Sequence, residues 1–169
     1  WCKRSSIAIN GGAAETPTSG KYFTIDRTWS PGDMINLSME MPVRMLYSDS
    51  RITDNIGQVA FARGPLVFCL EQQDVDFPIE RARVAMRPDE VAKLVQVEWN
   101  EDLLDGVNVL RMPGILAPDR PTNSNWPYFE ASSVGAPTEL MLIPFYARAN
   151  RSDDNRWMTF IPLSPKLNV

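Results

Sequence analysis

The sequence predicts an all-β protein with the architecture of an antiparallel, jelly-roll-like β-sandwich. Short stretches in which apolar and polar residues alternate recur along the chain, a pattern typical of strands with one buried face. Turn-forming residues separate these stretches at the spacing found in sandwiches. The 169 residues include 14 prolines and 9 glycines. This balance disfavours long helices, because proline removes a backbone donor and clashes inside a helix.

The N-terminal part of the chain contains several expected strands. Residues 7–9 form a short strand that runs into an Asn-Gly-Gly turn. Residues 22–29 alternate and predict a second strand. Residues 35–41 show the clearest period-two pattern in the chain and predict a half-buried strand. Pro42 ends or bends this strand, and residues 43–47 continue the alternation.

A polar stretch over residues 48–57 predicts a domain boundary, with residues 1–47 on one side and residues 48–169 on the other. Residues 66–70 are a continuous apolar run, as in a strand covered on both faces. A helical turn capped by Asp89 is expected within residues 88–94. Further strands are expected at residues 59–62, 96–99, 107–110, 140–147 and 157–163.

Composition and charge exclude several classes of function. With 17 Lys and Arg against 21 Asp and Glu, the net charge is −4, and no basic cluster suited to nucleic acid is visible. Apolar runs such as residues 140–145 are too short to cross a bilayer, so no membrane partner is expected. The sequence has no histidine, which removes the commonest general base and metal ligand.

The two cysteines, Cys2 and Cys69, are not in a metal-binding CxxC arrangement, so no structural zinc site is predicted. We favour a buried free thiol at Cys69, and a Cys2–Cys69 disulfide is the alternative.

Several carboxylates and amides of the sequence are candidates for catalysis or metal binding. Carboxylate pairs of the kind used by glycosidases follow two expected strands, but acidic residues at such places usually face solvent or cap turns. Runs of Asp and Asn that could bind calcium lack the EF-hand spacing. We therefore predict no catalytic residue, no metal site and no cofactor. The carboxylate groups are Glu71 with Asp74 and Glu98 with Glu101 and Asp102. The runs considered for calcium are Asp49 with Asp54 and Asn55, and Asp153 with Asp154 and Asn155.

The best candidates for binding are three aromatic residues, Trp126, Tyr128 and Phe129, in an expected loop over residues 117–137. Aromatic rings in a polar loop stack on the apolar face of a sugar or fill the pocket of a partner. The alternative, which we favour, is that they fold back over the edge of the sandwich as a lid.

Several segments of the chain carry a family resemblance: WCKRSSIAING (1–11), YFTIDRTW (22–29) with Gly32-Asp33, MPVR (41–44), the most specific one GQVAFARGPLVFCLE (57–71) with Asp74, LLDGVNVL (103–110), and IPFYARANR (143–151) with Trp157-Met158. Taken together, these segments resemble the C-terminal region of glycoside hydrolase family 127, the β-L-arabinofuranosidase-like enzymes. They occur in order and span nearly the whole chain. Arg148 departs from the pattern, because an aromatic residue is expected there, and the loop over residues 117–137 has no counterpart.

The resemblance implies that this chain is a non-catalytic C-terminal portion of a bacterial glycoside hydrolase. In that family the active site lies in a preceding (α/α)6 barrel, with glutamates and a zinc-bound cysteine nucleophile. None of those motifs is present, so no catalytic or metal residue is carried over, and Cys69 is not the nucleophile. The C-terminal region of the family is two β-sandwiches that pack on the barrel and contribute to dimer contacts. Residues 1–47 would be the second half of the first sandwich, and residues 48–169 most of the second.

The leading hypothesis is therefore an accessory β-sandwich portion that supports the barrel, shapes the rim of the substrate cleft and contributes to a homodimer. The alternative is an autonomous carbohydrate-binding module that uses Trp126, Tyr128 and Phe129 on a plant-type glycan. An independent enzyme is the least supported reading. The start at Trp1 leads us to expect a piece of a larger protein, and export from a bacterial cell would suit a polysaccharide-degrading parent.

Residues 1–47 pose a physical problem if they stand alone. Half a sandwich exposes apolar strand faces and unpaired strand edges. We expect this half to pack on the second domain, to pair with a neighbouring chain, or to be completed by further protein.

Overall fold

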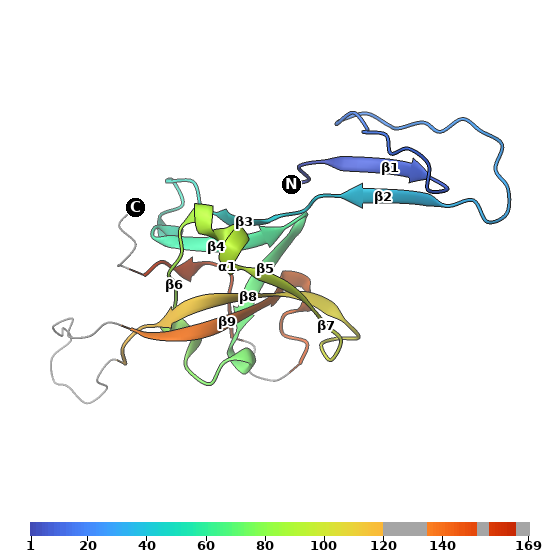
Figure 1. Cartoon of the computed structure of the whole chain (residues 1–169). Coiled ribbons are helices and arrows are strands. Elements are labelled where there is room, and N and C mark those ends of the chain that lie inside the picture. Colours follow the sequence, from blue (N-terminus) through green and yellow to red (C-terminus); the bar gives the residue numbers. More distant parts are fainter. Residues whose placement is uncertain (120–134, 152–155, 165–169) are drawn as a thin grey trace, which may run out of the picture. The chain divides into compact units, whose positions relative to one another are not determined.

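The computed structural model describes residues 1–119, 135–151 and 156–164. Contacts between residues divide the chain into two compact units, Trp1–Pro42 and Val43–Val169, which are drawn in Figure 1. Strands dominate both units, which confirms the predicted all-β class. Within the described ranges, no helix is long and apolar enough to span a membrane.

The first unit is built on a two-stranded antiparallel sheet. Its strands are β1 (Ser5–Ile9) and β2 (Ile35–Met39). Asn10 ends β1 with a positive φ of 51°, and its side-chain oxygen accepts the Met34 N–H at 2.8 Å, which fixes the start of β2. The long connection between the two strands is visible in Figure 1.

The expected strand over residues 22–29 is wrong. These residues alternate but form no strand. A strand requires a hydrogen-bonded neighbour, and within the described residues the sheet of this unit consists of β1 and β2 alone. Phe23 and Ile25 instead line a hollow of about 380 Å³ together with Ile7 and Ile9 of β1.

The structural division of the chain falls after Pro42, ahead of the boundary expected after residue 47. The reason is β3 (Val43–Leu46), which pairs with β4 (Gln58–Arg63) and so belongs to the second unit. The polar residues 48–57 form the connection between these two strands and include a short 3-10 turn, η1 (Thr53–Asn55).

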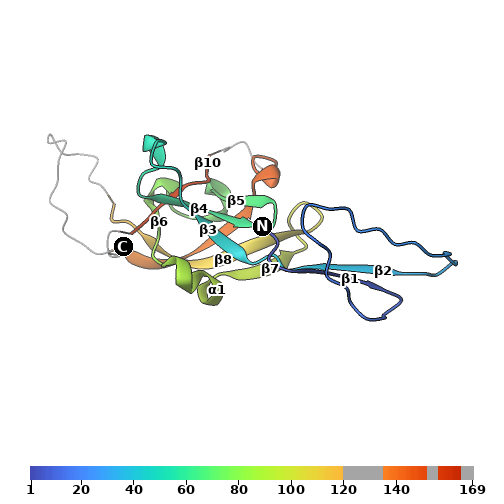
Figure 2. The same ribbon diagram turned by 90° about the horizontal axis from the view of Figure 1, so that it is seen from above.

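Nine strands of the described residues form one antiparallel sheet in the second unit. Besides β3 and β4 these are β5 (Leu66–Glu71), β6 (Ala82–Val84), β7 (Gln96–Asn100), β8 (Val107–Leu116), β9 (Ala136–Pro144), β10 (Trp157–Met158) and β11 (Ile161–Pro162). The order is β11, β4, β5, β9, β8 and β6, with β3 beside β4, β7 beside β8 and β10 beside β5. Figures 1 and 2 show the sheet curling, with β3 and β4 on one side of this unit and β8 and β9 on the other.

The curled sheet encloses one large hydrophobic core. Phe61 of β4 and Phe68 of β5 share this core with Leu110 of β8 and Leu142 of β9, and none of the four is more than 1% exposed. Full burial of such a side chain stabilises a fold by roughly 1.5–3 kcal/mol relative to leaving it in water. The core residues of β4, β5, β8 and β9 all belong to the second unit.

A second, smaller core lies on the other face of β5. Cys69 is buried there with Val109 and Ile143. From Phe68 onward β5 is therefore covered on both faces, as the continuous apolar run predicted. Its first two residues differ, because Leu66 and Val67 are 38% and 37% exposed.

The remaining elements are short. η4 (Pro88–Glu90) and α1 (Val91–Leu94) form the expected helical turn. The expected cap at Asp89 is wrong, because the Glu90 carboxylate accepts the Arg87 N–H at 2.7 Å instead. Three further 3-10 turns are η2 (Gln72–Asp74), η3 (Ile79–Arg81) and η5 (Phe145–Ala147). The last of these replaces the end of the strand expected at residues 140–147.

Candidate functional site

The most deeply buried charged group in the described part of the chain is Glu71, which ends β5 and is 2% exposed. Its carboxylate accepts hydrogen bonds from the backbone N–H of Ala149, from the Gln73 side chain at 2.6 Å and from Arg151 Nη2 at 2.6 Å. Buried carboxylates are stable only when paired in this way. The buried charge of Glu71 is therefore stabilised by three hydrogen bonds.

Arg151 joins Glu71 to a second acid. Its Nη1 and Nη2 donate to the two carboxylate oxygens of Asp74 at 2.8 and 2.6 Å. The side chains of Arg151, Glu71 and Asp74 are 20%, 3% and 5% exposed, and we call these three residues the ionic clamp. Bidentate, charge-assisted bonds of this kind are strong and directional. Because Arg151 lies 80 residues after Glu71, the clamp fastens the segment after β9 to the end of β5.

The protonation of Glu71 follows from these contacts. Burial alone would raise the pKa of Glu71, because it penalises the charged form. Hydrogen bonds from the Ala149 N–H and from the Arg151 and Gln73 side chains outweigh burial and hold the pKa of Glu71 below its ordinary value. The catalytic acid of a glycosidase needs the opposite, a raised pKa and free access to a leaving group. The clamp is therefore suited to bracing the fold.

Next to the clamp, Arg148 is stacked between two aromatic rings. Its guanidinium carbon lies 3.7 Å from the centroid of the Phe145 ring and 4.9 Å from that of Trp157, and Nη1 donates to the Phe145 carbonyl at 3.1 Å. Tyr146 and Trp157 are 61% and 42% exposed at this place. An aromatic residue was expected at position 148. Arg148 stands there instead, and its guanidinium forms cation–π contacts with both rings.

Cys69 offers no nucleophile. Both cysteines are free, so the alternative of a Cys2–Cys69 disulfide is wrong and the buried free thiol is confirmed. Burial in the smaller core raises the pKa of the Cys69 thiol to about 12. The thiol is therefore protonated at neutral pH, whereas thiol chemistry needs the thiolate.

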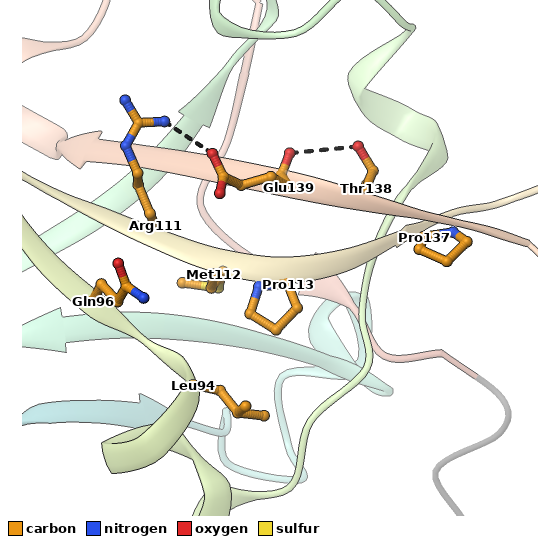
Figure 3. A pocket seen from close by; sticks show the side chains of 8 residues that line it. All are labelled: Leu94, Gln96, Arg111, Met112, Pro113, Pro137, Thr138 and Glu139. Atoms are coloured by element: carbon orange, nitrogen blue, oxygen red, sulfur yellow. Dashed lines mark hydrogen bonds and ion pairs between the residues drawn. The ribbon is translucent and has the colours of Figure 1, made fainter.

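A shallow groove of about 410 Å³ runs along β7, β8 and β9 (Figure 3). Arg111 lies in it, donating to Glu98 at 2.6 Å and to Glu139 at 3.0 Å, and these carboxylates raise the pKa of Arg111 above its ordinary value. Two nitrogens of this cation are therefore engaged by its own sheet. The groove is lined by Leu94, Gln96, Arg111, Met112, Pro113, Pro137, Thr138 and Glu139.

The remaining carboxylates of the sequence analysis are dispersed. Glu101 and Asp102 are exposed in the turn after β7, and Glu98 is paired with Arg111. Asp49 forms two bonds to the Arg51 side chain, at 2.8 and 3.0 Å. Among the described residues, no three His, Cys, Asp or Glu side chains come together as a metal site would require. Trp126, Tyr128, Phe129, Asp153, Asp154 and Asn155 lie outside the described residues.

Sequence reasoning missed the ionic clamp. In the sequence Glu71 and Asp74 stand out only as a carboxylate pair after a strand, and nothing near them points to Arg151. One signal was present, because Glu71 directly follows a continuous apolar run and a carboxylate in a strand covered on both faces needs a cationic partner. Which of the 17 Lys and Arg supplies the charge depends on the tertiary fold.

The first unit presents an uncovered apolar surface. Every residue of β2 is exposed, including Ile35 at 50%, Leu37 at 52% and Met39 at 40%. Exposed large apolar side chains that lie next to one another on one face of a strand usually mark a surface that another part of a protein covers.

These features define a class of protein: a curled antiparallel β domain, internally braced, that follows a small β unit with an open apolar face. The chain belongs to glycoside hydrolase family 127. Residues 43–160 match the C-terminal domain of that family, and residues 1–41 match the family's β-L-arabinofuranosidase middle domain. The resemblance inferred from the sequence is thereby confirmed.

Known relatives are much longer than this chain. The non-reducing end β-L-arabinofuranosidase of Bifidobacterium longum subsp. longum is 33% identical over 157 residues, which are 89% of this chain and 23% of that protein. A solved GH127 β-L-arabinofuranosidase from Geobacillus stearothermophilus T6 has a TM-score of 0.73 at 24% identity. The match covers 97% of this chain and 25% of the chain of that structure. A solved GH127 β-arabinofuranosidase has a TM-score of 0.72 at 24% identity over 95% of this chain and 23% of its own. The two structures support the fold.

Proposed function

We propose that this chain is the non-catalytic β-sandwich portion of a bacterial β-L-arabinofuranosidase-like glycoside hydrolase, and that it supports a catalytic (α/α)6 barrel. The observation that carries the proposal is the ordered match to the middle and C-terminal domains of the family, in a chain equivalent to 23% of its relative from Bifidobacterium longum. In this proposal residues 1–42 supply the second half of one sandwich, and residues 43–169, which include β3, supply the C-terminal sandwich.

The braced segment after β9 supports a scaffolding role. The ionic clamp holds this segment in one conformation, in which Ala149 has a positive φ of 59°. Beside it lie exposed Tyr146 and Trp157 and the stacked Arg148. Tyr, Trp and Arg dominate the energetics of protein interfaces, and anchors that are rigid before binding lose little entropy on docking. This surface is our candidate for contact with the barrel or across a homodimer.

The reaction we propose for the parent protein is hydrolysis of a terminal β-L-arabinofuranosyl linkage of a plant-type glycan. The support is the activity named for the Bifidobacterium longum relative. The chain itself would contribute no proton transfer and no nucleophile, because the pKa of Glu71 is lowered and that of Cys69 is raised. Export from the cell would suit this substrate.

The scaffolding role is tested by truncation of the longer protein that contains this chain. Removal of the segment corresponding to residues 1–169 is expected to lower the melting temperature of the remaining barrel and to shorten the half-life of its activity. The control is the full-length protein with Glu98→Gln, a change to a half-exposed residue of the same segment, which should change both quantities much less than the truncation does. A truncated barrel as stable and as active as the full-length protein would contradict the proposal.

A further inference from the structure

The hydrogen-bonding direction of β2 can be worked out from its partner β1. Ile7 of β1 donates its N–H to the Glu15 carbonyl at 2.9 Å and accepts the Glu15 N–H at 2.8 Å. Both backbone groups of Ile7 therefore point away from β2. Ile7 lies opposite Leu37, so this is a non-hydrogen-bonded pair of the antiparallel ladder. The N–H and C=O of Leu37 accordingly point to the outer edge of β2.

Backbone hydrogen bonds at the two ends of the β1–β2 hairpin show the same alternation of bonded and non-bonded pairs. Asn10 donates to the Met34 carbonyl at 2.9 Å, and Glu40 donates to the Arg4 carbonyl at 2.8 Å. Hydrogen-bonded pairs thus fall at the even-numbered positions of β2. Because the pattern repeats every two residues, the odd-numbered positions 35, 37 and 39 all direct their backbone groups outward. Within the described residues β1 is the sole strand paired with β2.

The same three positions carry the apolar side chains. Ile35 lies opposite Ile9, and Leu37 opposite Ile7, so these four side chains share one face of the sheet. Over β1 this face is partly covered, because Ile7 and Ile9 are half-buried and line the hollow that Phe23 also lines. Over β2 it is open. In the part of the chain that the structure describes, positions 35, 37 and 39 thus combine backbone groups that no strand pairs with and exposed apolar side chains.

Natural edge strands are usually protected by a charge, a proline or a bulge. The five residues of β2, Ile-Asn-Leu-Ser-Met, contain neither a charge nor a proline. Its register with β1 is uninterrupted from Ile35 to Met39, so it contains no bulge. A two-stranded sheet of this kind is also marginal on its own. The edge therefore has the properties of an interior strand.

Two occupants of the edge can be compared. A second copy of this chain could pair β2 with β2 about a two-fold axis through Leu37. That arrangement would satisfy the edge but place both apolar faces on the same side of a four-stranded sheet, without covering either. A strand that belongs to a further β layer satisfies the edge and brings a covering layer with it. The relatives hold about three quarters of their length outside the matched region, which supplies such a layer in the same polypeptide.

We propose that β2 accepts a strand from the part of the same polypeptide outside these 169 residues, through the N–H and C=O groups of Ile35, Leu37 and Met39. This inference rests on the proposed function, in which the chain is one portion of a longer family 127 protein. The incoming strand completes the sheet of the middle domain, and its layer covers the apolar face. β2 is then an internal strand, and the first unit is held to the rest of the protein by backbone pairing.

Amide hydrogen exchange resolved to single residues tests this directly, with the 169-residue chain and the full-length protein measured side by side. The amides of Asn36 and Ser38, bonded to β1, should be protected in both. The amide of Leu37 should exchange at least about tenfold more slowly in the full-length protein than in the chain. Equal exchange of Leu37 in the two proteins would overturn the proposal. Protection of Leu37 that rises with the concentration of the isolated chain would also overturn it, because the occupant would then be a second copy.

A matched pair of variants in the full-length protein separates the edge from general damage. Leu37→Asp places a charge on the apolar face, and Ser38→Asp places the same charge on the opposite face. Leu37→Asp should return the exchange of the Ile35 and Met39 amides to the rates of the isolated chain, whereas Ser38→Asp should not. Turnover of an aryl β-L-arabinofuranoside is recorded on the same samples. An inactive protein with a protected Leu37 contradicts the proposed activity alone, and an active protein with an unprotected Leu37 contradicts the edge pairing alone.

Discussion

Replacement of Glu71 by Gln tests the ionic clamp most sharply. The substitution keeps the shape of the side chain and leaves one oxygen to accept the Ala149 N–H. It removes the charge that pairs with Arg151 at 2.6 Å and can set an amide N–H against the donors of Arg151 or Gln73. Removal of one partner from a buried ion pair costs about 3–5 kcal/mol. Because Asp74 still holds Arg151, we expect a loss of about 2–3 kcal/mol.

The assay is urea or thermal unfolding of the 169-residue chain, followed by circular dichroism. For a domain of this size the expected loss lowers the melting temperature by about 4–12 °C. The matched control is Glu98→Gln, which removes a half-exposed carboxylate from Arg111 and should cost no more than about 1 kcal/mol. If Glu71→Gln were no more destabilising than Glu98→Gln, the argument that the clamp braces the segment after β9 would be refuted.

Three further predictions concern the same chain. Since the folded-state pKa of Glu71 is lowered, its contribution to stability is present above the unfolded-state pKa of about 4.3 and is lost as the pH falls through the folded-state value. The difference in the free energy of unfolding between wild type and Glu71→Gln should therefore be smaller near pH 3 than at pH 7. An equal difference at the two pH values would contradict a lowered pKa of Glu71. Gly106→Ala should destabilise the chain by more than about 1 kcal/mol, because Gly106 has a φ of +107° and a Cβ there would lie 2.1 Å from Trp99 Cζ2. Gly57→Ala is the control for backbone strain, because Gly57 also has a positive φ, +74°, but has open space around it. Equal melting temperatures of the two variants would count against the packing of Gly106 on Trp99. The Cys69 thiol should react with a thiol reagent only as fast as the chain unfolds, and rapid labelling of the folded chain at Cys69 would be inconsistent with its burial.

The aromatic loop is a separate proposal with its own test. If Trp126, Tyr128 and Phe129 formed a sugar-binding platform, the chain would bind arabinose-containing glycans and Trp126→Ala would abolish the binding. The account favoured from the sequence, in which these rings cover the sandwich edge, predicts instead no glycan binding by the chain. It also predicts a lower melting temperature for Trp126→Ala. Isothermal titration calorimetry and thermal unfolding of the two proteins distinguish these outcomes.

The sequence predicted the strands well wherever the cause of a strand lies within the strand itself. Residues 35–41 and 59–62 alternate, and they contain β2 and β4. The half-burial expected for residues 35–41 is wrong for β2, because every residue of β2 is exposed. Residues 22–29 alternate equally well but form no strand, because strand formation also depends on a neighbour. The second unit begins at Val43 because of the pairing of β3 with β4, which is a tertiary contact that periodicity does not report.

The polar interactions were less predictable for a similar reason. The clamp joins Glu71 to a residue 80 positions later, and nothing local to either residue specifies the other. The burial of Cys69 was predicted correctly, since it depends on the apolar run around it. The cap of the helical turn was assigned to Asp89 and is made by Glu90, a choice between neighbouring acids that depends on side-chain geometry.

We propose that the chemistry of the family 127 protein that contains this chain lies elsewhere in the polypeptide. The most direct test is hydrolysis of an aryl β-L-arabinofuranoside by the 169-residue chain and by the full-length protein, measured side by side. We expect turnover by the full-length protein and none by the chain. Turnover by the chain alone, lost on Glu71→Gln at a pH where that variant is still folded, would contradict it.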